Sequence, residues 1–186
     1  MAYTVAPHLS QFNVPLAEFS ATKPGFTDFG VGGLIVTPPP ATEQQEQWRI
    51  LLLQRTPTDS YGNYWEGPGG GLDPGEDATI LAGAAREIHE ESGLRVSRFV
   101  DLVAVDQWSR VKPDGLHVVA KFTFLVEVEG QESGEQLQVK LEETEHQAFV
   151  WATKENIEEG IEGRGVYQFV GVQGRHFLKA LEMAKG

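Results

Sequence analysis

The hydrophobic residues of the chain fall into short blocks that polar and glycine- or proline-rich segments separate. Residues 30–37 and 48–55 are predicted strands, because aliphatic and β-branched residues dominate both blocks. Residues 99–108 and 117–128 are longer blocks, rich in the β-branched and aromatic side chains that favour extended structure. Because residues 112–115 between them read Lys-Pro-Asp-Gly, which is turn chemistry, these two blocks are predicted to pair as a hairpin.

The second half of the chain adds a predicted strand at residues 147–152 and a predicted helix at residues 167–184. The helix has an uneven apolar face made by Phe169, Val172, Phe177, Leu178 and Leu181. The polar segments 38–46 and 129–138 are predicted loops. This order of elements predicts a mixed α/β domain.

The length of the chain favours one core. A chain of 186 residues with 40% hydrophobic content builds a single sizeable domain. Residues 28–186 are interpreted as that domain, including the C-terminal helix. Residues 1–27 are interpreted as an N-terminal arm or edge segment.

The segment from Pro68 to Leu94 has the start and stop signals of a loop, a helix and a second loop. Three glycines follow Pro68, Pro74-Gly75 supplies a second turn, and Gly93 closes the helix. One side of this helix is an apolar stripe formed by Leu81, Ala84, Ala85 and Ile88. The stripe predicts that one face of the helix packs on the core.

Three glutamates occupy the neighbouring face of the same helix. Glu87, Glu90 and Glu91 stand at positions i, i+3 and i+4, so their side chains share an arc of roughly 100°. Two such charges about 4 Å apart repel by roughly 1 kcal/mol in water and about 4 kcal/mol at an effective dielectric of 20. A cation would neutralise them, and oxygen-only ligands suit Mg²⁺ or Mn²⁺.

This segment resembles the signature of the Nudix hydrolases, which reads G, five residues, E, seven residues and R-E-U-x-E-E-x-G-U, with U a bulky aliphatic residue. Gly70 and Glu76 have the first spacing. The fixed positions of the second half are filled by Arg86, Glu87, Ile88, Glu90, Glu91, Gly93 and Leu94. Residues 77–85 separate Glu76 from Arg86, two more residues than the family pattern has. Glu76, Asp73 or Asp77 therefore fills the loop carboxylate position.

The resemblance implies a Nudix-type α/β/α sandwich with a mixed β-sheet and a loop-helix-loop metal site. It also implies that Glu91 is a metal ligand, that Glu87 is a ligand or base, and that Glu90 and Glu76 are further ligands. Arg86 would hold a carboxylate in one rotamer. A further base or ligand is expected from the loop before residue 147, where Glu145 is preferred over Glu142 and Glu143.

Recognition of the substrate is less specified by the sequence. The candidates for a stacking aromatic, for which core packing is the competing interpretation, are Trp65, Tyr64 and Trp108. Arg55 is a candidate phosphate ligand, and Gly70 and Gly71 of the loop are assigned to substrate binding. The resemblance implies hydrolysis of the diphosphate linkage of a nucleoside diphosphate joined to another moiety. The alternative is a catalytically silent Nudix-fold module that binds a ligand.

Charge and composition limit the kinds of molecule that the chain is expected to bind. The formal net charge of −12 disfavours long nucleic acid, which binds basic patches, whereas a small diphosphate that arrives with Mg²⁺ is compatible. The absence of cysteine excludes thiolate chemistry and disulfides. No signal-like start and no apolar run of about 20 residues is present, so a cytoplasmic protein without membrane contact is expected. Many relatives pair, which makes a homodimer compatible with the resemblance.

Overall fold

The computed structural model describes residues 2–39, 47–131 and 137–186. Residues 40–46 of the loop expected at 38–46 and residues 132–136 of the loop expected at 129–138 therefore lie outside the described residues. The elements in chain order are β1 (Thr4–Val5), the 3-10 helix η1 (Pro7–Phe12), α1 (Leu16–Ala21), β2 (Asp28–Thr37), β3 (Arg49–Arg55), β4 (Trp65–Glu66), α2 (Ile80–Ser92), β5 (Val96–Lys112), β6 (Gly115–Val128), β7 (His146–Thr153), α3 (Lys154–Ile161) and α4 (Gln173–Met183).

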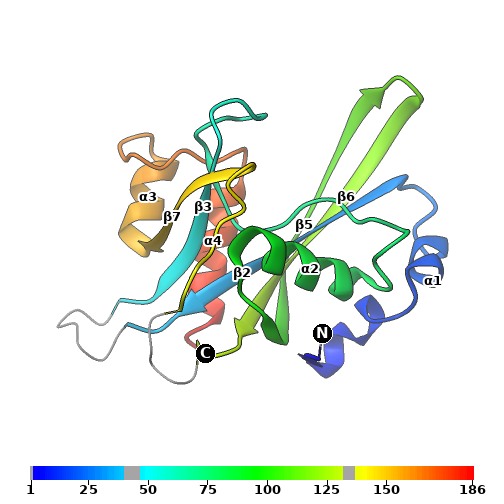
Figure 1. Ribbon diagram of the computed structural model, residues 1–186, viewed down its shortest axis with the longest axis horizontal. Coiled ribbons are helices and arrows are strands. Elements are labelled where there is room, and N and C mark those ends of the chain that lie inside the picture. The colour runs from blue at the N-terminus through cyan, green and yellow to red at the C-terminus, as the bar shows by residue number, and fades with distance from the viewer. Residues whose placement is uncertain (1, 40–46, 132–136) are drawn as a thin grey trace.

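Strand β2 joins the two halves of a mixed seven-stranded sheet, ordered β1-β5-β6-β2-β3-β4 with β7 also paired to β3. Residues 28–35 of β2 run parallel to β6, and only Val36 and Thr37 pair antiparallel with β3. The β5–β6 hairpin is long and extends beyond the rest of the sheet (Figure 1). The other edge of β2 is thus left for the glycine-rich loop.

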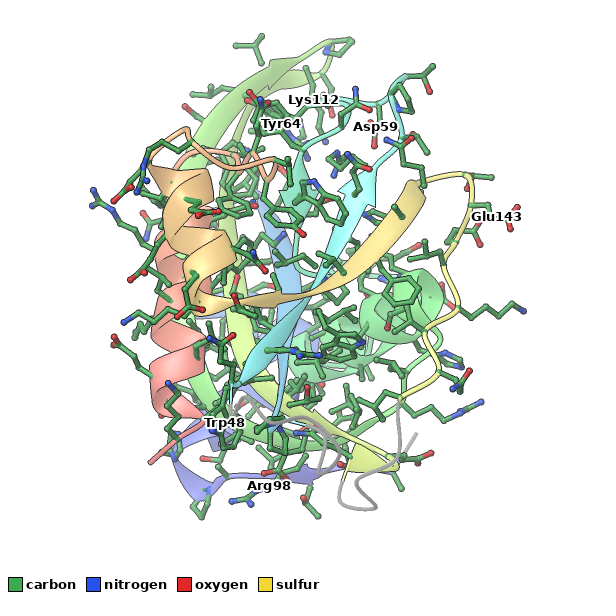
Figure 2. All side chains as sticks on the ribbon, turned by 90° about the vertical axis from the view of Figure 1, so that its left-hand side faces the viewer. Trp48, Asp59, Tyr64, Arg98, Lys112 and Glu143 are labelled. Carbon is green, nitrogen blue, oxygen red and sulfur yellow. The ribbon has the colours of Figure 1, made fainter. Side chains whose placement is uncertain are left out.

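The side chains of β2 alternate between two cores. Val31 and Ile35 pack with α2, η1 and α1, and Leu34 and Val36 pack with α3 and α4. Figure 2 shows the strands between the α3–α4 pair on one side and α2 on the other. This arrangement confirms the predicted α/β/α sandwich with a mixed sheet.

The predicted strands are all present, β4 is a short strand that was not predicted, and the other differences concern helices. Helix α4 begins at Gln173, six residues later than expected. Residues 167–169 lie outside the helix and make contacts with other parts of the chain. The backbone N–H of Trp65 donates to the carbonyl of Gln168, and the ring of Phe169 packs 5.3 Å from that of Phe177. Helix α3 was not predicted, although Thr153 and Asn156 form a capping box at its start.

Residues 2–27 pack against the sheet. Strand β1 pairs in parallel with β5 at one edge of the sheet. Leu9, Phe12 and Phe19 are buried in the same core as α2. Within the described ranges, no helix combines the length and the apolar character needed to cross a bilayer.

A close approach of the glycine-rich loop to β2 generates the first prediction. Gly69 has φ of +150°, and an added Cβ would lie 2.3 Å from the carbonyl oxygen of Val31, whereas a Cβ on Gly71 meets nothing within 4 Å. Gly69→Ala should therefore lower the free energy of unfolding by about 2 kcal/mol or more, or Tm by roughly 4–8 °C. Gly71→Ala is the matched control and should change stability by less than about 0.5 kcal/mol. Equal Tm values for the two variants in thermal unfolding would contradict this account of the loop.

Candidate metal centre and active site

Helix α2 is delimited by side chains that the sequence supplies. The Thr79 hydroxyl accepts a hydrogen bond from the N–H of Ala82 at 3.0 Å, and Gly93 ends the helix in the left-handed conformation with φ of 72°. The helix thus starts at Ile80, and residues 77–79 belong to the loop before it. The spacing of the carboxylates within the helix is unaffected.

The position of α2 over the sheet depends on its apolar stripe. Leu81, Ala84, Ala85 and Ile88 are all buried, as predicted. A Cβ added to Gly33 would lie 2.2 Å from Cδ1 of Ile88, so the helix lies directly on β2 at this glycine. Glu87 and Glu91 lie at the edge of this stripe and face the glycine-rich loop.

Backbone hydrogen bonds hold that loop along the free edge of β2. Val31 N–H donates to the carbonyl of Gly70 at 2.9 Å, and Gly33 N–H donates to that of Pro68 at 3.0 Å. Leu72 N–H donates to Phe29 O at 2.9 Å. The loop is therefore hydrogen-bonded along β2 in the manner of an added strand beside α2.

Two of the predicted carboxylates lie against this loop. The N–H of Gly69 donates to Oε2 of Glu91 at 2.7 Å, and the Glu91 residue is only 5% exposed. A Cβ on Gly70 would lie 2.6 Å from Oε2 of Glu87, so only a glycine leaves that carboxylate its place. Loop and helix together fix both groups.

The electrostatic environment of these carboxylates favours a bound proton or a cation. Burial raises the pKa of Glu91 to about 9 despite the Gly69 hydrogen bond, and the charges of Glu66, Glu87 and Glu145 add to the rise. Burial likewise raises the pKa of Glu87 against the lowering effect of Arg86. A divalent cation would displace these protons and relieve the repulsion.

Arg86 organises the outer part of the site. Its Nε and Nη2 donate to the two oxygens of Asp77 at 2.9 and 2.8 Å, and its Nη1 donates to Glu90 at 2.8 Å. Nη2 also lies 3.0 Å from Oε1 of Glu87. Glu90 is turned outward, with a side chain 53% exposed.

Among the three loop carboxylates left open by the sequence, Asp77 is the one in contact with Arg86. Asp77 is buried, whereas Glu76 is exposed and its side chain makes no hydrogen bond or ion pair within the described ranges. The Asp73 carboxylate accepts from the N–H of Gly75 at 2.7 Å. The assignment of Glu76 as a metal ligand stays a prediction.

The start of strand β7 brings His146, and Glu145 just before it, to the helical carboxylates. Ligand atoms of Glu91, Glu145 and His146 all lie within 4.8 Å of one another. Glu145 is exposed, whereas His146 is 2% exposed. Figure 2 shows Glu143 out on the loop before β7, on the side of the sheet away from α3 and α4.

Sequence reasoning missed two buried members of this site. His146 Nε2 lies 3.3 Å from Oε1 of Glu66, and the guanidinium of Arg55 also contacts Glu66. Burial would raise the pKa of Glu66, but the His146 hydrogen bond and the charges of Lys121, Arg55 and His146 hold it below its usual value. The available signals were the place of Glu66 just before the glycine loop and of His146 beside Glu145.

The donor set fits a divalent metal ion. Glu87, Glu91 and Glu145 supply carboxylate oxygens, and burial makes an uncompensated charge on Glu91 costly. His146 adds an imidazole ring. Its Nδ1 atom is buried and has no hydrogen-bond partner in the described part of the chain. A cluster of this composition is a candidate metal centre.

The residues predicted to bind substrate have other contacts as well. Arg55 donates to Glu66, to Asp59 and, at 2.7 Å, to the carbonyl of Ser60. Trp65 is buried, with its ring centroid 5.2 Å from that of Tyr167. Gly70 and Gly71 border Glu87 and Arg86, since Arg86 Nη2 donates to Gly71 O at 3.2 Å.

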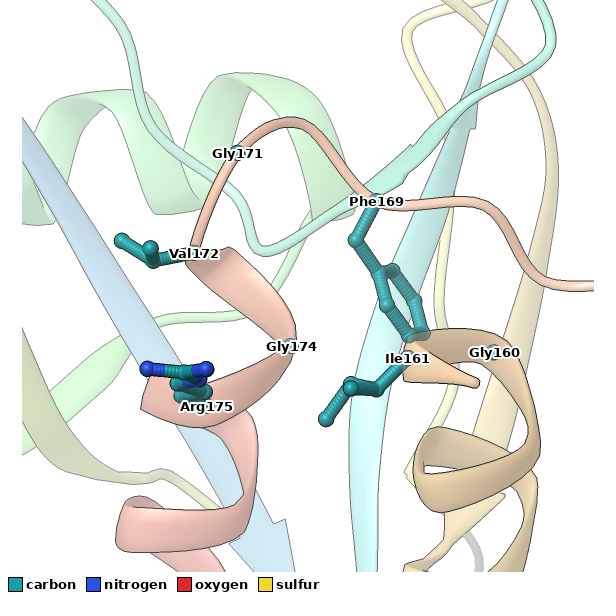
Figure 3. Close-up of a pocket in the computed structure, with 7 residues that line it drawn as sticks. All are labelled: Gly160, Ile161, Phe169, Gly171, Val172, Gly174 and Arg175. Atoms are coloured by element: carbon teal, nitrogen blue, oxygen red, sulfur yellow. The ribbon is translucent and has the colours of Figure 1, made fainter. Parts of the chain in front are cut away.

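Two cavities adjoin these elements, and neither is lined by Glu87, Glu91 or Glu145. A cavity of about 20 Å³ lies between the loop and α4, with Gly67, Pro68 and Lys121 among its lining residues. A cavity of about 290 Å³ lies between the end of α3 and the start of α4 and is lined by Ile161, Phe169, Val172 and Arg175 (Figure 3). No predicted site residue lines the larger one.

Known proteins share this fold. A family model described as NUDIX domain matches residues 39–168. A MutT NUDIX hydrolase from Burkholderia pseudomallei is 21% identical, with TM-score 0.52 over 83% of this chain and 95% of that one. The NUDIX domain of Shewanella oneidensis NrtR complexed with ADP ribose is 16% identical, with TM-score 0.59 over 90% and 97% of the two chains. A C. elegans Ap4A hydrolase is 21% identical, with TM-score 0.52 over 84% and 99%.

No curated protein matches the sequence at a significant level. The sandwich fold with a carboxylate-bearing helix under a glycine-rich loop is the fold of NUDIX domains. The chain belongs to the Nudix family and is a Nudix hydrolase, a pyrophosphohydrolase in kind.

The Arg86–Asp77 pair gives a second prediction. Asp77→Asn removes one charge from a buried, bidentate ion pair, so it should lower the free energy of unfolding by about 2 kcal/mol. Glu76→Gln should change it by less than about 0.5 kcal/mol, because the Glu76 side chain is exposed. Urea denaturation of both variants measures the difference. A larger loss for Glu76→Gln than for Asp77→Asn would show that Glu76 is the partner of Arg86.

The raised pKa of Glu91 gives a third prediction, about pH. Between the usual value of 4.5 and about 9, the folded protein keeps a proton that the unfolded chain releases, so raising the pH lowers stability without metal. Glu91→Gln removes this loss and should raise Tm at pH 8 in EDTA by several degrees, about 2 kcal/mol in stability. The gain should vanish near pH 4. Glu143→Gln, at an exposed position, is the control and should show no pH-dependent difference.

Proposed function

We propose that the protein hydrolyses the diphosphate linkage of a nucleoside diphosphate joined to another moiety, with Mg²⁺ or Mn²⁺ as its cofactor. The observation that carries this proposal is the convergence of Glu91, Glu145 and His146 within 4.8 Å. Glu87 lies beside them against Gly70. Like charges held this close to a buried carboxylate are stable only with a proton or a cation, and a diphosphate brings its own need for a cation.

The chain's residues divide the work between holding and proton transfer. Bound divalent ions supply positive charge to the phosphate oxygens and lower the pKa of water. Glu91 and Glu87 are proposed as ligands, held by Gly69 N–H and Arg86 respectively. Glu90 and Glu76 remain candidate ligands at the outer edge.

Glu145 is proposed as the general base. It is exposed, so substrate and water reach it, and its charge is felt by both Glu87 and Glu91. The attacking water gives its proton to the Glu145 carboxylate while the new P–O bond forms and the bridging P–O bond breaks. The displaced phosphate group leaves with the electrons of that bond.

Substrate binding is proposed at the end of the glycine-rich loop. Gly70 and Gly71 border the carboxylates, and Arg55 lies beside Glu66. Trp65 is buried in the core that contains α3 and α4. The Shewanella oneidensis domain was solved with ADP ribose and the C. elegans protein is an Ap4A hydrolase, which supports testing both chemistries.

A second function is a binding module without turnover. Shewanella oneidensis NrtR was also solved with a 27mer DNA, at 14% identity to this chain. The net charge of −12 and the complete carboxylate set favour the enzyme. That this chain does not bind long nucleic acid stays a prediction.

The fourth prediction tests the activity. Purified protein with millimolar Mg²⁺ should release a nucleoside monophosphate from ADP-ribose, dinucleoside polyphosphates or nucleoside diphosphate sugars, measured by chromatography. Glu91→Gln and Glu145→Gln should each lower kcat by roughly 10²-fold or more, because one loses a ligand and the other the base. Glu155→Gln, exposed on α3, should leave kcat unchanged.

The outcomes separate the two functions. No turnover of any substrate, together with binding of one of them in calorimetry, would support the binding module. Turnover that Glu91→Gln leaves unchanged would refute the proposed centre.

A further inference from the structure

His146 is the least satisfied buried group of the site. Its side chain is 1% exposed, and its Nδ1 is buried with no hydrogen-bond partner within the described parts of the chain. Buried polar atoms nearly always have a hydrogen-bond partner. A buried atom with no protein partner therefore indicates a partner that is not part of the chain.

The other ring nitrogen already has a partner. Nε2 lies 3.3 Å from Oε1 of Glu66, which Arg55 contacts from its other side. A neutral imidazole that donates from Nε2 to the Glu66 carboxylate has its lone pair on Nδ1. Metal-binding histidines usually have this arrangement, in which a carboxylate fixes the tautomer and the free nitrogen binds the ion.

The strand register is what places His146 on the side of α2. A β-bulge between Gln54 and Arg55 makes His146, in place of Gln147, the partner of Arg55. A shift of one residue moves a side chain to the other face of a sheet. Gln147 instead donates from Nε2 to the carbonyl of Arg55 at 2.9 Å.

We propose that Nδ1 of His146 is a ligand of the metal ion held by Glu91, next to the proposed base Glu145, so that the centre is a mixed nitrogen and oxygen site. The proposal rests on the proposed function only in that the site holds a divalent ion. Glu91, Glu145 and His146 each offer one ligand atom, and these three atoms lie within 4.8 Å of one another, a span that one ion can bridge.

A nitrogen donor changes which ion the site prefers. Imidazole binds transition metals better than Mg²⁺, which prefers carboxylate, carbonyl and water oxygens. His146 therefore raises the affinity for Mn²⁺ relative to Mg²⁺. Glu66 and Arg55 are positioning residues in this scheme, since they act through the orientation of the imidazole.

Pulsed electron paramagnetic resonance of the protein loaded with Mn²⁺ tests the proposal without any turnover. The wild type should show ¹⁴N modulation from a coordinated imidazole, which should be replaced by ¹⁵N features when the histidines are labelled with ¹⁵N. His146→Gln should lose the modulation and weaken Mn²⁺ binding roughly tenfold or more, with a smaller change for Mg²⁺. Glu66→Gln should weaken Mn²⁺ binding by about tenfold while the modulation remains.

The matched control is His8→Gln, because His8 is exposed and pairs with Asp101 on another part of the surface. This variant should keep both the modulation and the affinity. If His146→Gln does not fold, the labelled wild type decides, since it needs no substitution and His146 is the histidine of the cluster.

Bound Mn²⁺ without nitrogen modulation, modulation that survives His146→Gln, or no Mn²⁺ binding at all would each overturn the proposal. The first two outcomes leave the hydrolase function intact. Failure of the function would appear instead as Mn²⁺ binding with nitrogen modulation but no turnover of any substrate.

Discussion

The hydrogen bond from Gly69 N–H to the Glu91 carboxylate joins the two parts of the molecule that must meet for a site to exist. It requires the loop to lie along β2, which Val31 and Gly33 enforce by donating to its carbonyls. It also requires α2 to lie close over the same strand, which the missing side chain of Gly33 allows. The strand, the loop and the helix are therefore one structural unit, and the burial of Glu91 is its consequence.

Charges in this unit are divided between paired and unpaired carboxylates. Asp77 and Glu90 are paired with Arg86, whose pKa they raise, and Glu66 is paired with Arg55 and His146. Glu91 has no cationic partner among the described residues, and its pKa rises to about 9. Because Arg86 and Arg55 are both occupied by other carboxylates, Glu91 is left to a bound proton or to a cation from outside the chain.

The helical half of the site could be predicted from sequence because helix geometry is local. Glu87 and Glu91 lie one turn apart, so their common face follows from spacing alone. The choice among Glu76, Asp73 and Asp77 could not be predicted, because it depends on where Thr79 starts the helix after two additional residues. The late start of α4 likewise follows from a hydrogen bond between Trp65 and Gln168, which no local pattern shows.

The other half of the site comes from pairing across β3. Glu66 reaches it because β4 pairs with Leu53, and His146 reaches it because the bulge pairs it with Arg55. These residues lie 80 positions apart in the chain, and a single-residue shift in either pairing would turn one of them away from α2. Glu87 and Glu91 stay together in any state that keeps α2 on β2, whereas Glu145 and His146 leave with β7. A local opening of β7 would therefore leave the helical carboxylates in place while removing the proposed base and the nitrogen, so completion of the site depends on the edge of the sheet.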